Sequence, residues 1–211
     1  RRPPRSTLFP YTTLFRSRTL AVLALCSILG CVSGSGLDTR FAAKAVPEDI
    51  CRVAVLPFEN RTRNAEAGTL AYRVFSSELQ ASGALEVEPE GEVRLFMLRH
   101  RLLPGEVLDP GHYADLNQRL GVDAVVTGVV VEVGMDSAKA GESVPFVALQ
   151  VNMFDARDGQ RVLSTFHRRW GDDYRKAMHF GMVKTITGVL SHLSREVIED
   201  WLKKGVGNCK R

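Results

Sequence analysis

The run Asp123–Val131 restricts the fold of this chain more than any other feature of the sequence. It contains five valines in nine residues, and every residue after Asp123 is uncharged. Successive side chains of a strand point to opposite faces of a sheet, so a strand that is apolar at successive positions is buried on both faces. The run therefore predicts a central strand in a sheet that is covered on both sides.

Other segments of the chain show strand or helix patterns in turn. Short apolar runs predict strands at 52–58, 84–88, 144–155 and 160–171, and apolar stripes with helical spacing predict helices at 65–82, 90–101, 111–120 and 174–204. Asp158 and Gly159 form a hairpin signal between the last two strands. We expect Asp172 and Asp173 to cap the last helix. The order β-α-β-α-α-β-β-β-α predicts a single α+β domain over residues 51–204, with helices packed on a mixed sheet and a tail at 205–211.

The composition excludes several classes of protein. The chain has 211 residues, of which 45% are hydrophobic and 25% charged, so it is neither disordered nor a membrane protein with many spans. Its formal net charge is +4, but residues 1–30 hold five arginines and no acid. The remaining 23 basic and 24 acidic residues nearly balance, so nothing favours a nucleic-acid partner.

Residues 7–17 resemble no protein family. They match the in-frame translation of a common short-read sequencing adapter over all their positions. The alternative is a natural leader that contains proline and arginine. On the adapter interpretation, residues 1–17 are a non-native leader and take no part in the fold.

Residues 18–30 are typical of a lipoprotein signal peptide. Arg18 precedes about a dozen mostly apolar residues, too few to span a membrane. The segment Ile28–Cys31 resembles the bacterial lipobox, which implies cleavage between Gly30 and Cys31 and lipidation of the Cys31 sulfur and amine. Two or more acyl chains anchor a protein stably. The alternatives are an ordinary secreted protein or a buried apolar helix with an incidental cysteine.

Residues 31–50 are expected to be the lipidated cysteine and a flexible tether. They have no sustained periodicity, and a coil of this length reaches roughly 25 Å on average. Val32 stands where related lipoproteins of the inner membrane carry aspartate. The resemblance therefore implies an anchor on the periplasmic face of the outer membrane.

Three motifs occur in an order that points to a family. They are Val53–Thr62, Leu120–Val130 and Asp155–Gly159. Together they resemble the superfamily of bacterial envelope lipoproteins that includes CsgG, the N-terminal domain of TolB and LpoB, over roughly residues 52–170. The resemblance implies a non-enzymatic, lipid-anchored protein that binds another envelope protein in assembly, secretion or activation. The alternative is a periplasmic lipoprotein that binds a small molecule or a glycan.

No motif favours an enzyme, a metal site or a cofactor. The chain has no G-x-S-x-G motif and no P-loop, and none of its five histidines lies four residues from another or beside a cysteine at metal-ligand spacing. We therefore expect no catalytic residue, no metal ligand and no cofactor. Function is expected to come from contacts with an unidentified envelope protein, and self-association into a homo-oligomer stays open.

Two further features have alternative interpretations. Arg168, Arg169 and Trp170 form either a docking site for a partner or a solvated strand end with salt bridges. Cys51 and Cys209 remain after processing, and such a pair often forms a disulfide in an oxidising periplasm. The alternatives for the cysteines are two free thiols or a bond between chains.

Overall fold

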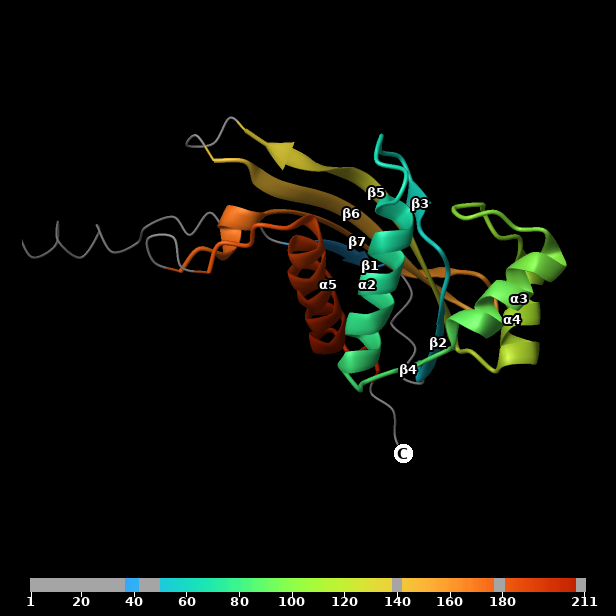
Figure 1. Cartoon of the computed structure of the whole chain (residues 1–211). Helices are drawn as coiled ribbons and strands as arrows, with labels where there is room; N and C mark the ends of the chain where they lie inside the picture. Colours follow the sequence, from blue (N-terminus) through green and yellow to red (C-terminus); the bar gives the residue numbers. More distant parts are fainter. Residues whose placement is uncertain (1–36, 42–49, 138–141, 177–180, 208–211) are drawn as a thin grey trace, which may run out of the picture. The chain divides into compact units, whose positions relative to one another are not determined.

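The computed structural model describes residues 37–41, 50–137, 142–176 and 181–207. They form an α+β domain in which α-helices pack on one mixed sheet of seven strands, as the sequence predicts (Figure 1). The strands are β1 (Asp38–Phe41), β2 (Arg52–Val55), β3 (Glu59–Asn60), β4 (Glu86–Val87), β5 (Ala124–Asp136), β6 (Val144–Asp155) and β7 (Arg161–Trp170). The helices are α2 (Ala67–Ala81), α3 (Glu90–His100), α4 (Pro110–Leu120) and α5 (Ile186–Lys203), with a short 3-10 turn η1 (Gly171–Tyr174).

The sheet has the strand order β1-β7-β6-β5-β2-β4, and β3 also pairs with β5. β2 runs parallel to β4 and β5, whereas β5, β6, β7 and β1 form antiparallel pairs. The valine-rich strand β5 therefore lies inside the sheet, as predicted. Gly159 has φ +67° in the β6–β7 turn, a conformation that glycine adopts without strain.

Helices α2 and α5 lie side by side on one face of the sheet (Figure 1). Their apolar stripes bury a core with the inward side chains of β2, β5, β6 and β7. Trp201 of α5 is almost fully buried there, and its indole Nε1 donates to the Thr165 hydroxyl at 2.8 Å. Trp201 is therefore part of this core.

Helices α3 and α4 form a second, smaller core against the other face of the sheet. Their buried side chains pack on Ala54, Leu56 and Val125. Asp109 caps α4 by accepting from the backbone N–H of His112 at 2.9 Å, and Gly121 ends that helix with φ +64°. Within the described residues, no helix is long and apolar enough to cross a bilayer.

The predicted start of the last helix is wrong. Helix α5 begins at Ile186 rather than Tyr174, because the Thr185 hydroxyl accepts from the N–H of Gly188 and caps the helix there. Gly181 has φ +86°, which also excludes a continuous helix. Asp173 instead accepts from the backbone N–H of Trp170 and holds the turn η1.

Both ends of the domain differ from the predicted boundaries. Asp38–Phe41 lies in the segment expected to be a tether, yet it forms β1 on the edge of β7. Thr39 fixes this strand to α5, since its hydroxyl donates to Asp200 at 2.7 Å. At the other end, Val206 belongs to the expected tail but is buried in the core.

Candidate functional site

Helices α3 and α4 cover only part of the sheet face on which they pack. The alternation of β5, β6 and β7 places on this face Thr127, Val129, Glu132, Phe146, Gln150, Asn152, Ser164, Phe166, Arg168 and Trp170. We call this set the open face. Phe166, on β7, is 42% exposed. A strand pair with one face on a core normally turns polar residues to water, so exposed aromatic rings here indicate a contact surface.

Arg168 organises one end of the open face. Its guanidinium carbon lies 4.7 Å from the ring centroid of Trp170 and 5.8 Å from that of Phe146. The same guanidinium forms an ion pair with Glu132 on β5. Stacking on rings and pairing with a carboxylate hold these side chains in one arrangement before any partner arrives.

Arg169 does not belong to this surface. As the neighbour of Arg168 on a strand, it faces α5, where its Nε donates to Glu196 at 2.8 Å. The buried His167 bonds the same carboxylate through Nε2. Burial raises the pKa of Glu196, but the hydrogen bonds of His167 and Arg169 outweigh it and hold that pKa below its ordinary value. Arg168, Arg169 and Trp170 are therefore not one cluster: Arg168 and Trp170 lie on the open face, and Arg169 ties β7 to α5.

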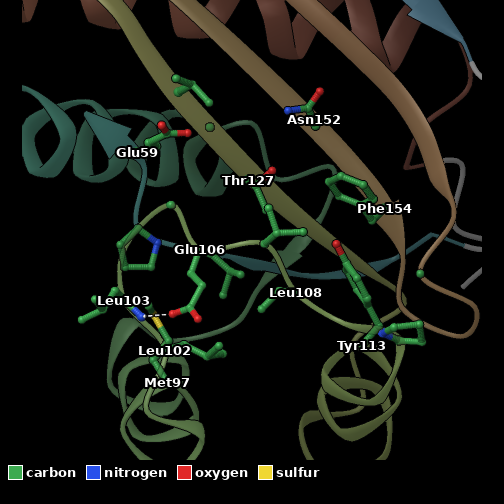
Figure 2. A pocket seen from close by; sticks show the side chains of 18 of the residues that line it. Glu59, Met97, Leu102, Leu103, Glu106, Leu108, Tyr113, Thr127, Asn152 and Phe154 are labelled. Carbon is green, nitrogen blue, oxygen red and sulfur yellow. Dashed lines mark hydrogen bonds between the residues drawn. The ribbon is translucent and has the colours of Figure 1, made fainter. Parts of the chain in front are cut away.

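A cavity of about 350 Å³ lies where the open face meets the connection between α3 and α4 (Figure 2). Its floor is made by β5 and β6, and its opposite wall by residues 102–108. The lining is mostly apolar and includes Leu56, Met97, Leu102, Leu103, Val107, Leu108, Tyr113, Val129 and Phe154. This size falls at the lower end of the range of ligand pockets.

Two glycines hold the walls of the cavity in place. Gly105 has φ +82°, and a Cβ there would lie 2.6 Å from the Cβ of Glu59. Gly159 has φ +67°, and a Cβ there would lie 2.8 Å from the ring of Tyr113. The Glu106 carboxylate also accepts from the N–H of Leu103 at 2.9 Å (Figure 2). The wall is thus a packed loop with its own hydrogen bonds.

Besides the carboxylates of Glu59, Glu106 and Asp158, few polar groups line the cavity. Thr127 and Asn152 present a hydroxyl and an amide from the strands, and the side chain of Tyr113 rises from α4 towards them (Figure 2). Burial raises the pKa of Tyr113 to about 12, so its hydroxyl is neutral at physiological pH. These groups can orient a ligand, but they include no nucleophile paired with a base.

No group of three or more His, Cys, Asp or Glu side chains that could hold a metal occurs in the described part of the chain. His100 and His112 come together, with ring centroids 5.0 Å apart, and each contacts a carboxylate, Asp115 or Asp109. Hydrogen bonds from Arg119 and His100 hold the pKa of Asp115 below its ordinary value. This cluster connects α3 to α4.

The expected lipidation and cleavage residues, Cys31 and Gly30, lie outside the described residues, and so does Cys209. Cys51 is disulfide-bonded. Its pairing with Cys209 stays a prediction.

No protein-family model matches the sequence, and no curated protein sequence is significantly similar to it. Solved structures of the same α+β class do match. The PelC dodecamer from Paraburkholderia phytofirmans is 17% identical, with a TM-score of 0.53, over 83% of this chain and 99% of that chain. Lipoprotein GNA1162 from Neisseria meningitidis is 21% identical, with a TM-score of 0.48, over 72% of this chain and 99% of that chain.

The C-terminal domain of LpoB from Escherichia coli also matches, with 14% identity and a TM-score of 0.44 over 61% of this chain and 89% of that chain. The match with PelC shows that the two chains share a fold. Identities this low show a shared fold and leave the role of this chain open.

Proposed function

We propose that this chain is a non-enzymatic envelope lipoprotein, anchored by Cys31 to the periplasmic face of the outer membrane. It acts by binding another envelope protein in assembly, secretion or activation. The observation that carries the proposal is the open face, where Phe166, Arg168 and Trp170 present ordered aromatic surface to solvent. Aromatic and arginine side chains dominate the energetics of protein interfaces.

The anchor supplies the mechanism. Lipid chains on Cys31 confine the domain to a thin layer at the membrane, which raises its effective concentration for a partner held in the same layer. A weak contact through the open face is then sufficient for binding. The domain needs no reacting group for this role.

Self-association is a second part of the proposal. The PelC chains with this fold form a dodecamer. The edge strand β1 and the open face are two different exposed surfaces, and contact between unlike surfaces produces a ring when the rotation between copies closes. Native mass spectrometry of the mature chain tests this, and a homo-oligomer that Phe166→Ser dissociates is the expected result. A monomer at all concentrations contradicts it.

The test of partner binding uses a photo-crosslinking amino acid at Phe166 in the full-length chain, expressed in a bacterium with two membranes. The control position is Lys203, whose side chain is 76% exposed on α5. We expect a discrete crosslinked product from position 166, none from position 203, and loss of the product in Cys31→Ser. Equal products from both positions, or a product that is independent of Cys31, would contradict the proposal.

The cavity is the site for a second candidate function, the binding of a small molecule or glycan. Thr127, Asn152 and Tyr113 could orient such a ligand. A rise in the melting temperature of the mature chain with neutral sugars, absent in Asn152→Trp, is the result that would favour this function over the first.

A further inference from the structure

We propose that the cavity between β5, β6 and residues 102–108 binds an apolar side chain that lies next to a positive charge in a segment of a partner protein. The choice of a protein partner rests on the proposed function. The charge preference of the cavity does not, because it follows from the lining alone.

The rim of the cavity carries unusually exposed apolar side chains. Val107 is 89% exposed and Leu103 is 71% exposed, and both also line the cavity. Leu98, 65% exposed, lies in the last turn of α3 close to the same loop. Of the six large apolar side chains exposed within the described residues, four belong to α3 or to the loop that follows it. A ligand that fills the cavity and covers its edge removes Leu103 and Val107 from water.

The charges of the cavity exclude an anion. Glu59, Glu106 and Asp158 line it, and the described lining includes no lysine, arginine or histidine. Glu59 is already paired with Arg61, at 2.7 Å. Glu106 has no ion pair within the described residues and accepts only the N–H of Leu103. A positive group beside the apolar ligand would form an ion pair with Glu106.

The exposed rim favours a protein segment over a free small molecule. The cavity of about 350 Å³ accommodates a large side chain, and a segment of chain can also cover Leu103 and Val107 at its edge. An anchor side chain in a pocket, surrounded by contacts that exclude water, is the arrangement found at the energetic centre of protein interfaces. A glycan would meet mainly apolar walls here and would leave most of its hydroxyl groups without partners.

The test compares two probes that share an indole ring and differ in charge: tryptamine, a cation, and indole-3-propionate, an anion. Binding to the mature chain in zwitterionic nanodiscs is followed by methyl NMR. We expect tryptamine to shift the methyl signals of Met97, Leu103 and Val107 and to bind about tenfold more tightly than indole-3-propionate. Glu106→Gln should remove most of this preference, whereas Glu92→Gln, an exposed change on α3 outside the cavity, should retain it. Equal affinities, or shifts confined to other parts of the domain, would overturn the charge preference.

A second pair of probes tests whether the ligand of the cavity is a segment of a protein. The peptide acetyl-Lys-Trp-Lys-amide should bind more tightly than tryptamine, because it also covers the rim, and acetyl-Glu-Trp-Glu-amide should not bind. Val107→Ser should weaken the peptide at least about threefold and leave tryptamine unchanged. If tryptamine binds and the peptide binds no better, the cavity is a site for a small amine and the partner segment is wrong. If neither tryptamine nor the lysine peptide binds, the cavity is not a binding site of this kind. The crosslinking test at Phe166 does not depend on this result, so the two proposals can fail separately.

Discussion

The carboxylate of Glu196 on α5 accepts a hydrogen bond from the Nε atom of Arg169 on β7 at 2.8 Å. His167, with only 2% of its side chain exposed, bonds the same carboxylate. One carboxylate therefore bonds two side chains of β7 in a largely buried layer. The contact joins the last strand of the meander to the helix that covers it, so it bears on the stability of the whole domain.

Removing this carboxylate should destabilise the domain. Glu196→Ala removes the carboxylate that the half-buried Arg169 and the buried His167 share, and we expect the free energy of unfolding to fall by about 1–3 kcal/mol. The matched control is Glu199→Ala on the same helix, where an exposed pair with Lys203 at 4.0 Å is lost. That change should cost less than about 0.5 kcal/mol. Urea denaturation measures both, and equal losses would contradict a special role for Glu196.

The contribution of Glu196 should depend on pH. Its folded-state pKa lies below the ordinary value of 4.5, because bonds from His167 and Arg169 outweigh the effect of burial. A carboxyl with a lowered folded-state pKa stabilises the fold fully above its unfolded-state pKa, and this stability is lost as the pH falls through the folded-state value. The difference in unfolding free energy between wild type and Glu196→Gln should therefore be largest above about pH 5 and shrink below it. A difference that grows on acidification would contradict this assignment.

Sequence patterns predict the centre of this fold better than its ends. The valine-rich β5 and the turn at Gly159 follow from local signals, and both are observed. Strand β1 has no such signal, since Asp38–Phe41 is ordered by pairing with β7 and by the bond from Thr39 to Asp200. These are contacts with residues more than a hundred positions away, which a local pattern does not contain.

The candidate site was only partly predictable for the same reason. The arginines and tryptophan at 168–170 indicate a candidate site in the sequence. Because successive side chains of a strand point to opposite faces, the same sequence also predicts that Arg169 faces away from Arg168 and Trp170. The cavity is assembled from several distant segments, so no motif marks it. One local signal was available: the loop after α3 places Leu103 and Val107 among turn residues, where exposed apolar side chains need an explanation.

Gly105 should be essential for the wall of the cavity. Gly105→Ala adds a Cβ that would lie 2.6 Å from Glu59 at a φ of +82°, so we expect a loss of about 2–3 kcal/mol in unfolding free energy and altered methyl shifts for Leu103 and Val107. Gly83→Ala separates the cost of a positive φ from the cost of the steric clash, because φ is +64° there but no atom lies within 4 Å. It should cost only about 1 kcal/mol. Gly91→Ala, in a helix with open space, should be neutral or slightly stabilising.

A bond between Cys51 and Cys209 agrees with the path of the chain. The carbonyl oxygen of Cys51 accepts from the N–H of Glu86 at 2.8 Å, so the strand that follows Ala84 lies beside this cysteine. Gly207 packs against the same segment, because a Cβ there would lie 3.2 Å from the Ala84 carbonyl oxygen. Cys209 is two residues further along, and two residues of chain span at most about 7 Å.

The bridge would close a loop of most of the chain, which stabilises the fold by about 5 kcal/mol in the chain-entropy model. We therefore expect Cys209→Ser to lower the unfolding free energy of the oxidised mature protein by up to about this amount, and to have little effect once the wild type is reduced. Titration of the denatured, unreduced wild type should find no reactive thiol, and Cys209→Ser should expose one. Two reactive thiols per wild-type chain would refute the bridge, and a dimer on non-reducing electrophoresis would assign the bond to a second chain instead.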